Sequence, residues 1–599
     1  MIKERLAKLR AAMAERNIDI YFIPTADFHE SENVGEYFKT RTFMSGFDGS
    51  AGVMAVTMNE AGLWTDGRYW IQAERQIAGS TIKLYKMGEE GVPSVEQFID
   101  AKLPENGKLG FDGRVVNARL GMNFKKIADK HNASMHIDED LVDLFWNDRP
   151  AMANEPAFIL DTKYSGKAVA EKLHDVRAKM AEEGASVHVL TSLDDIAWLL
   201  NIRGRDIESF PVVISFAVIT KEECLWFVGK NAITEAVAKH LADNNITVKP
   251  YGEIYDYLPS LVNEKVWLDL HRANYRIYNI FADTSFVAKT TPVILMKAIK
   301  NPVELENTRN AHIKDGVAFT KFMYWLKNNA GKMHITEKSA EEYLLKCREA
   351  QEGFIEPSFT TISAYGANAA MMHYHATAET NTDVELGNFY LVDSGGHYWE
   401  GSTDITRTMA LGELSYEQKL HFTAVCRSTL NLAAAKFLYG CNGQNLDILA
   451  RGPIWDLGID YKCGTGHGMG YLLLIHEPPN GFRWKSVPER VDGGILEEGM
   501  VTTDEPGIYL EGKYGIRTEN ELICHKGEKN EHGQFMYFEN ITVAPIDLDG
   551  ILPDEMSKTE RQRLNDFHKF VYMKLSPYMT EEENAWLRHY TREIQLHKS

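Results

Sequence analysis

Residues 389–411 read Phe-Tyr-Leu-Val-Asp-Ser-Gly-Gly-His-Tyr-Trp-Glu-Gly-Ser-Thr-Asp-Ile-Thr-Arg-Thr-Met-Ala-Leu. An apolar run, a polar glycine-rich turn and a second alternating run predict two strands that pair as a hairpin. Asp393 lies near the end of the first strand and Asp404 begins the second, so both side chains can reach one point. A carboxylate beside a buried strand is costly unless it is hydrogen-bonded or bound to a metal. The stretch therefore favours a metal site, with a local turn cap as the alternative for each aspartate alone.

Three later motifs offer further ligands, namely Gly464-Thr-Gly-His-Gly, Thr503-Asp-Glu-Pro-Gly and Gly515-Ile-Arg-Thr-Glu-Asn. His467 stands between glycines, which let the backbone approach an ion closely. In the second motif the spacing does not choose between Asp504 and Glu505. In the third, Glu519 and Glu521 share one face of a strand, so that choice also stays open. Four carboxylates and one imidazole form an oxygen-rich set that suits two divalent ions activating a water for hydrolysis.

Charge and composition narrow the class of protein. The formal net charge is −20, and a negative field disfavours binding to nucleic acid and to anionic membranes. No stretch approaches 18 uninterrupted apolar residues, and the first ten residues lack the apolar core of a secretory signal. The six cysteines show no CxxC pair, which favours free thiols in a reducing compartment. We therefore expect a cytoplasmic protein without membrane spans.

The first half of the chain contains an internal repeat. Four residues return 167 positions later: Leu6, Arg10, Met13 and Glu15 recur as Leu173, Arg177, Met180 and Glu182. In each copy a helical pattern runs into an apolar strand. A chain of 599 residues is too long for one core, and the repeat predicts two related α/β domains, at 1–155 and 156–298.

A third domain, 299–599, is expected to begin with a helix at Asn301-Pro-Val-Glu. There Asn caps the helix, Pro fits its first position, and Glu can bond back to the cap. Short strands with glycine-rich turns follow from 389, with helices near 415–440 and 443–457. A capping box at Thr580 predicts a terminal helix that packs on this domain, as a C-terminal helical extension.

Taken in order, the motifs resemble those of the proline-specific aminopeptidases, in particular the long three-domain aminopeptidase P. The proposed ligands are separated by steps of 11, 63, 38 and 14 residues. The resemblance covers nearly the whole chain, including Ser45-Gly-Phe-Asp-Gly-Ser-Ala-Gly, Trp64-Thr-Asp-Gly-Arg-Tyr, Leu193-Asp-Asp-Ile-Ala-Trp and Ala311-His-Ile-Lys-Asp. It implies a multidomain α/β and α+β protein. Two related creatinase-like domains would precede a catalytic domain with the pita-bread fold, which is shared with methionine aminopeptidase and prolidase.

The resemblance also implies the metal ligands. Asp393, Asp404, His467, Glu505 and Glu519 would hold two divalent ions. The family favours Mn²⁺, while the ligand chemistry also admits Co²⁺ or Zn²⁺. Glu505 would in addition accept a proton from the water between the ions.

Outside the ligands, the resemblance assigns substrate and oxyanion contacts to His373 and His476, and it places Arg517 along the site. Two positions depart from the family pattern. Cys463 stands where many relatives of the long type carry His, and His375 stands where a small residue is usual. These departures bear on substrate preference more than on the reaction.

The implied activity is that of a hydrolase. It would be a metal-dependent aminopeptidase that releases the N-terminal residue from peptides with proline in second position, acting as a cytoplasmic homodimer. One alternative is a prolidase restricted to Xaa-Pro dipeptides, and the long duplicated N-terminal half favours the aminopeptidase. The other alternative is a pita-bread domain that only binds. The presence of all five ligands argues against it, because a site and not a fold carries function.

Overall fold

The computed structural model describes residues 1–487 and 492–595. The chain forms two compact units, Met1–Thr162 with Lys167–Ile294, and Lys163–Gly166 with Leu295–Ser599. Along the described ranges, every helix is either too short or too polar to cross a membrane.

The first unit contains two six-stranded sheets with equivalent strand order. The first sheet has the order β4-β3-β2-β1-β5-β6, from β1 (Ile20–Pro24), β2 (Val53–Thr57), β3 (Ala61–Thr65), β4 (Lys83–Lys86), β5 (Lys108–Gly110) and β6 (Ser134–His136). The second has the order β12-β11-β10-β8-β13-β14, from β8 (Val187–Leu190), β10 (Ser215–Thr220), β11 (Cys224–Val228), β12 (Ile246–Pro250), β13 (Val266–Leu268) and β14 (Val287–Ala288). In both sheets three central strands pair antiparallel and the outer strands add in parallel. The predicted relationship between the two α/β halves is therefore confirmed.

The repeated arginine makes an equivalent contact in both halves. Helix α1 (Ile2–Glu15) precedes the first sheet and helix α7 (Val169–Glu182) precedes the second. Arg10 Nε donates to the Thr57 carbonyl at 2.9 Å, and Arg177 Nε donates to the Thr220 carbonyl at 2.9 Å. Each arginine thus ties its helix to the end of an equivalent strand, β2 or β10.

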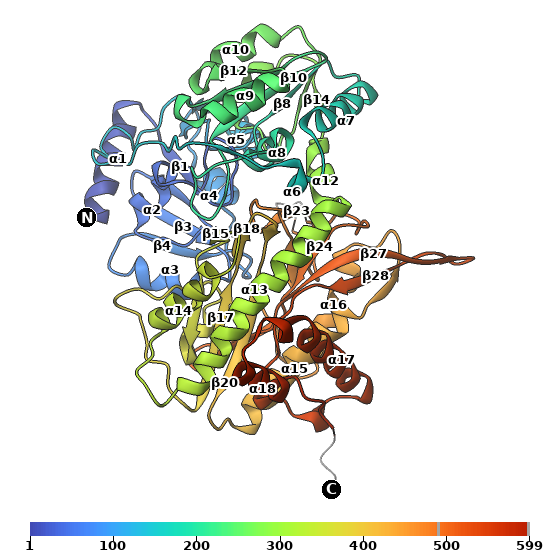
Figure 1. Cartoon of the computed structure of the whole chain (residues 1–599). Coiled ribbons are helices and arrows are strands. Elements are labelled where there is room, and N and C mark those ends of the chain that lie inside the picture. The colour runs from blue at the N-terminus through green and yellow to red at the C-terminus, as the bar shows by residue number, and fades with distance from the viewer. Residues whose placement is uncertain (488–491, 596–599) are drawn as a thin grey trace. The chain divides into compact units, whose positions relative to one another are not determined.

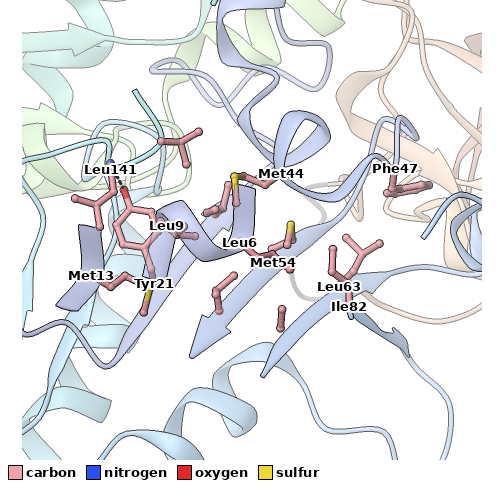
Figure 2. Packing of buried hydrophobic residues seen from close by; sticks show 14 of the residues in the cluster. Leu6, Leu9, Met13, Tyr21, Met44, Phe47, Met54, Leu63, Ile82 and Leu141 are labelled. Atoms are coloured by element: carbon pink, nitrogen blue, oxygen red, sulfur yellow. Dashed lines mark hydrogen bonds between the residues drawn. The ribbon is translucent and has the colours of Figure 1, made fainter. Parts of the chain in front are cut away.

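The apolar members of the repeat form the core of each half. Figure 2 shows Leu6, Leu9 and Met13 of α1 gathered with Tyr21 and Met54 of the underlying strands. Apolar residues at helical spacing on one element and alternate positions on the other make this packing predictable from sequence.

His188, on β8, is a buried histidine. It is expected to make the stability of the second six-stranded sheet sensitive to acid. Its Nδ1 lies 3.1 Å from the Trp267 carbonyl and its Nε2 lies 2.9 Å from Thr291 Oγ1. Burial lowers the pKa of His188 to about 4. The neutral form is therefore favoured in the folded state. The stability it provides is present above the unfolded pKa of about 6.5 and is lost as pH falls towards 4, by about 3 kcal/mol at most.

We predict that His188→Gln flattens the decline in the free energy of unfolding between pH 6.5 and 4, because glutamine does not titrate. Urea unfolding at several pH values measures this decline. His174→Gln, at an exposed position on α7, is the matched control and should keep the wild-type slope. An equal slope in His188→Gln and wild type would contradict the prediction.

The first long helix of the second unit is α13 (Pro302–Asn329), which begins where the sequence predicted. Asn301 Oδ1 accepts hydrogen bonds from the backbone of Val303 and Glu304, and Glu304 Oε2 accepts one from the backbone of Asn301. The two side chains satisfy backbone groups that the start of a helix leaves without partners. The helix runs on past Trp325 to Asn329.

Strands β17 (Asn388–Ser394) and β20 (Ile405–Leu411) pair antiparallel, as predicted, with Asp393 opposite Thr406. They form a sheet with β16 (Ile362–Tyr365), in the order β16-β17-β20. The connection between them is more than the simple turn we expected. It folds as β18 (Gly396–Tyr398) and β19 (Gly401–Ser402), which join β15 (Phe354–Pro357) in a separate sheet. Gly395 permits this fold, because a Cβ there would lie 1.8 Å from the Thr403 carbonyl oxygen.

A six-stranded sheet supplies the other side of the site. Its order is β21-β28-β27-β24-β22-β23, from β21 (Lys436–Leu438), β22 (Gly466–Gly468), β23 (Glu477–Phe482), β24 (Val501–Asp504), β27 (Asn520–Asn530) and β28 (Gly533–Asn540). In Figure 1 the β27–β28 hairpin extends beyond the rest of this sheet.

Other helices of this unit are α14 (Glu337–Glu349), α15 (Tyr416–Ala433), α16 (Gly443–Trp455), α17 (Lys558–Leu575) and α18 (Glu581–Tyr590). Among them, α15, α16 and α18 correspond to predicted helices, whereas α14 and α17 were not predicted. Helix α15 ends earlier than expected, because β21 occupies residues that we assigned to it. Thr580 caps α18, and Lys321 of α13 forms an ion pair with Glu583 at 2.7 Å, so the terminal helix packs on α13 as predicted.

Candidate metal centre

The predicted ligands lie on or directly beside strands of the second unit. Asp393 is in β17, Asp404 precedes β20, His467 is in β22, Glu505 follows β24 and Glu519 precedes β27. Paired strands hold backbone positions firmly, so a site built on them is well ordered. The strands themselves come together through long-range pairing, in which β22 pairs with β24 and β24 pairs with β27.

His467 is oriented towards the carboxylates. Its Nε2 lies 3.5 Å from Asp404 Oδ2 and 3.4 Å from Glu505 Oε1. One ligand atom each from Asp404, His467 and Glu519 lies within 4.8 Å of the others. His467 Nδ1 is 2.9 Å from the Gly468 carbonyl, which accepts a hydrogen bond from Nδ1–H, so Nε2 is the ring nitrogen that could bind a metal.

Asp393 and Glu519 meet through Thr406, which lies opposite Asp393 in the β17–β20 pair. Glu519 accepts a hydrogen bond from Thr406 Oγ1 at 2.7 Å and donates its backbone N–H to the Thr406 carbonyl at 3.1 Å. One oxygen of each carboxylate, Asp393 Oδ1 and Glu519 Oε1, is buried without a hydrogen-bond partner in the described part of the chain. A buried polar atom left without a partner is costly, and a cation would satisfy both atoms.

The electrostatics lead to the same conclusion. Burial raises the pKa of Asp404 well above its ordinary value, and repulsion from Asp393 adds to the effect. Burial likewise raises the pKa of Glu519, with repulsion from Asp404 as the next cause. A bound cation reverses this balance by favouring the charged carboxylates. Donor chemistry, orphaned oxygens and repulsion together fit divalent cations.

Glu521 and Asp504, which the sequence motifs offered as alternatives to Glu519 and Glu505, have different surroundings. Glu521 Oε1 accepts the backbone N–H of Asp404 at 2.7 Å and lies 2.9 Å from His312 Nε2. Although burial lowers the pKa of His312, the charge of Glu521 raises it, and the net shift is upward. Glu521 therefore positions the Asp404 backbone, and these contacts favour Glu519 as the ligand. The carboxylate of Asp504 is fully buried, and burial raises its pKa well above the ordinary value.

Arg517 connects both sides of the site. Its guanidinium donates from Nη2 to Asp393 Oδ2 at 2.6 Å, from Nε to Thr406 Oγ1 at 3.1 Å and from Nη1 to Tyr509 Oη at 2.7 Å. A planar fork of donors can hold several acceptors in fixed geometry. Sequence reasoning placed Arg517 at the site but missed Thr406, Tyr509 and His312. Thr406 and His312 make their contacts across long sequence separations, whereas Tyr509 lies eight residues before Arg517 on the neighbouring strand.

The structure places the other predicted residues as follows. The rings of His476 and His467 meet edge to face with centroids 4.2 Å apart, so His476 adjoins a proposed ligand. His373 follows η5 (Gly366–Ala370) in the sequence and is half-buried, and its contact with substrate stays a prediction. His375 is exposed, with Nδ1 3.3 Å from the Thr361 carbonyl. Burial raises the pKa of Cys463 to about 11, so its thiol is uncharged at neutral pH.

The cluster of carboxylates and one imidazole on these strands is a candidate metal centre, and the match to a metallopeptidase family model gives the class of protein. Family sequence models match in order along the chain: "Creatinase/Prolidase N-terminal domain" at residues 5–139 and again at 148–304, "Metallopeptidase family M24" at 306–526 and "C-terminal region of peptidase_M24" at 534–594. The chain is 34% identical to Aminopeptidase P1 of Arabidopsis thaliana, with 99% of this chain and 100% of that protein covered. It is 33% identical to Xaa-Pro aminopeptidase 1 of Dictyostelium discoideum, with 98% and 96% covered.

A solved structure agrees with these matches over the whole chain. It is that of X-prolyl aminopeptidase from Caenorhabditis elegans, described as a cytosolic enzyme with a di-nuclear active site. The TM-score is 0.95 and the identity 32%, with 99% of this chain and 100% of that chain covered. The chain belongs to the Xaa-Pro aminopeptidase, or aminopeptidase P, family of M24 metallopeptidases. The predicted family and fold class are thus confirmed.

Proposed function

We propose that this enzyme hydrolyses the peptide bond between an N-terminal residue and a proline in second position. The observation that carries the proposal is the buried cluster around Asp404, His467 and Glu519, whose ligand atoms lie within 4.8 Å of one another. The names of its full-length relatives, aminopeptidase P and Xaa-Pro aminopeptidase, support the substrate class.

Five residues would hold two divalent cations: Asp393, Asp404, His467, Glu505 and Glu519. The di-nuclear site of the C. elegans relative supports the number of ions. We propose Mn²⁺, although Co²⁺ or Zn²⁺ would also suit these ligands. When bound, the cations supply Lewis acidity and make a water molecule nucleophilic at neutral pH.

The side chains around the proposed metal site would have different roles in the reaction. Glu505 is partly exposed, with Oε1 3.4 Å from His467 Nε2, and it would accept the proton of the attacking water. His476 would donate to the developing oxyanion, a contact typically worth about 2.7–4 kcal/mol. His373 would contact the substrate, and Arg517 would keep Asp393 in place. The proline nitrogen must be protonated before it can leave as an amine.

We also propose limits of 1–155, 156–298 and 299–599 for the three domains. The family models at 5–139, 148–304 and 306–526 support this division. A homodimer in the cytoplasm remains part of the proposal, and the relative described as cytosolic supports the location.

A peptide panel tests the function. We expect cleavage of Xaa-Pro-Xaa peptides with added Mn²⁺, loss of cleavage in EDTA, and recovery when Mn²⁺ is restored, because the carboxylate cluster needs cations to act. The released residue is measured by chromatography. Xaa-Ala-Xaa peptides serve as the control for the proline requirement.

Two outcomes of this panel would contradict the proposal. Activity confined to Xaa-Pro dipeptides would identify a prolidase. Absence of activity together with absence of bound Mn, Co or Zn would identify a binding module instead.

A further inference from the structure

The backbone that leads into His467 is held by two buried side chains of α16. Arg451 and Asp447 lie four residues apart on this helix, and neither side chain is exposed. Arg451 Nε donates to Asp447 Oδ2 at 2.8 Å, so the carboxylate fixes the orientation of the guanidinium. A buried ion pair of this kind is costly to form unless its remaining donors and acceptors are also satisfied.

Most of the remaining hydrogen bonds of Arg451 go to the segment 460–463, and Nη2 also donates to Thr465 Oγ1 at 3.4 Å. Nη1 donates to Asp460 Oδ1 at 2.8 Å and to the Tyr461 carbonyl at 2.9 Å, and Nη2 donates to the Cys463 carbonyl at 3.1 Å. The guanidinium carbon also lies 3.8 Å from the centre of the Tyr461 ring. One planar cation thus orders several consecutive parts of this segment.

Asp447 extends the same network to the two ligand segments. Its Oδ1 accepts a hydrogen bond from Thr465 Oγ1 at 2.5 Å, and Tyr461 Oη lies 2.6 Å from that same hydroxyl. The Thr465 carbonyl in turn accepts the backbone N–H of Glu505 at 2.7 Å. Thr465 therefore connects the α16 pair both to the strand of His467 and to Glu505.

The direction of the His467 ring is tied to its local backbone, while the ring also packs against His476. His467 Nδ1 bonds to the carbonyl of its own neighbour, Gly468, so the ring direction follows the local backbone. On the other side, Gly466 lies so close to β24 that a Cβ would be 1.8 Å from the Thr503 carbonyl oxygen. With glycine on both sides of His467, Thr465 is the nearest preceding side chain through which the segment can be held.

We propose that Arg451 and Asp447 are positioning residues for the metal centre, which set the placement of His467 and Glu505 through Thr465. The inference deepens the proposed function and rests on it. In metal sites, residues that orient the ligands typically change metal affinity about 10–100-fold when they are mutated.

The test substitutes Arg451→Lys and follows metal binding by the metal-free full-length protein. Lysine keeps the positive charge but offers one point of donation in place of a fork, so it cannot hold Asp447 and three acceptors of the segment together. Mn²⁺ affinity is measured by calorimetry, and the visible absorption of the Co²⁺ form reports ligand geometry. We expect Mn²⁺ affinity to fall about 10–100-fold and the Co²⁺ spectrum to change.

Arg348→Lys is the matched control. Arg348 of α14 is also buried, and it binds Asp315 through Nε at 2.7 Å and Nη2 at 3.0 Å. Tyr398 completes this cluster by donating to Asp315 Oδ1. The control loses a buried arginine fork in the same unit but should keep wild-type Mn²⁺ affinity and Co²⁺ spectrum.

Wild-type affinity and spectrum in a folded Arg451→Lys protein would overturn the inference and leave the pair a merely structural role. If that variant does not fold, Thr465→Val decides, since it removes the Thr465 hydroxyl and keeps the α16 pair. Lower Mn²⁺ affinity in Thr465→Val supports the inference, and unchanged affinity overturns it. A wild-type protein that binds neither Mn²⁺ nor Co²⁺ would instead refute the proposed function.

Discussion

Replacing Asp404 with alanine abolishes peptide cleavage while the chain still folds. Asp404 is a proposed ligand whose carboxylate oxygen lies within 4.8 Å of ligand atoms of both His467 and Glu519, so its loss would remove a ligand rather than a supporting contact. We expect kcat/KM to fall by at least about 10³-fold, beyond the 10–100-fold typical of residues that only orient ligands. The measurement is cleavage of an Xaa-Pro-Xaa peptide at saturating Mn²⁺, with bound metal determined on the same sample.

Folding should survive this substitution for two reasons. Glu521 holds the backbone N–H of residue 404, which alanine retains. In addition, burial and repulsion from Asp393 raise the pKa of Asp404, so removing the carboxylate relieves an unfavourable interaction in the metal-free protein. Circular dichroism and thermal unfolding check the fold. Asp566→Ala, at an exposed position of α17, is the control and should keep full activity. An active Asp404→Ala enzyme would contradict the whole site assignment.

Glu505→Gln lowers kcat by about 10²–10⁴-fold, the usual contribution of a general base. Glutamine keeps the size and one oxygen of the side chain but cannot accept the proton of the attacking water. We therefore expect the loss mainly in kcat, with a smaller change in KM. Steady-state kinetics on the same Xaa-Pro-Xaa peptide separate the two constants.

Asp504→Asn is the matched control, because the sequence pattern alone could not choose between these neighbouring acids. Asp504 is fully buried, and within the described residues neither of its oxygens has a hydrogen-bond partner. Burial raises its pKa well above the ordinary value, and a neutral acid closely resembles the amide of asparagine. Asp504→Asn should therefore keep kcat within about threefold of wild type, far smaller than the loss of about 10²–10⁴-fold expected when a general base is removed. The opposite pattern, an active Glu505→Gln and an inactive Asp504→Asn, would reverse the assignment.

Local features of the fold were predictable because their causes are local. The cap at Asn301 and Glu304 depends on residues three positions apart, and the strand at 388–394 follows from a short apolar run. The repeat of helix and strand was readable because the equivalent arginines and apolar residues recur at a constant interval. The family resemblance then chose between neighbouring acids where periodicity could not.

Contacts between distant segments could not be predicted in this way. Glu521 and His312 are 209 positions apart in sequence, and Arg517 and Asp393 are 124 positions apart, yet each pair is in contact. The folded connection between β17 and β20 was missed for the same reason, since β18 pairs with β15 far upstream. No local sequence pattern predicts these long-range contacts, because they depend on which strands pair.

By itself, the sequence determined the family, the order of the domains and the residue types that can bind divalent cations, since these follow from local pattern and motif spacing. Only the tertiary structure decided how those groups are held. In the folded chain Glu521 binds the Asp404 backbone, and Arg517 binds Asp393 and Thr406. Arg451 and Asp447 form a pair that holds the segment before His467. The physical reason is that a carboxylate's role depends on which donors reach it after long-range strand pairing, and burial makes those few contacts decisive.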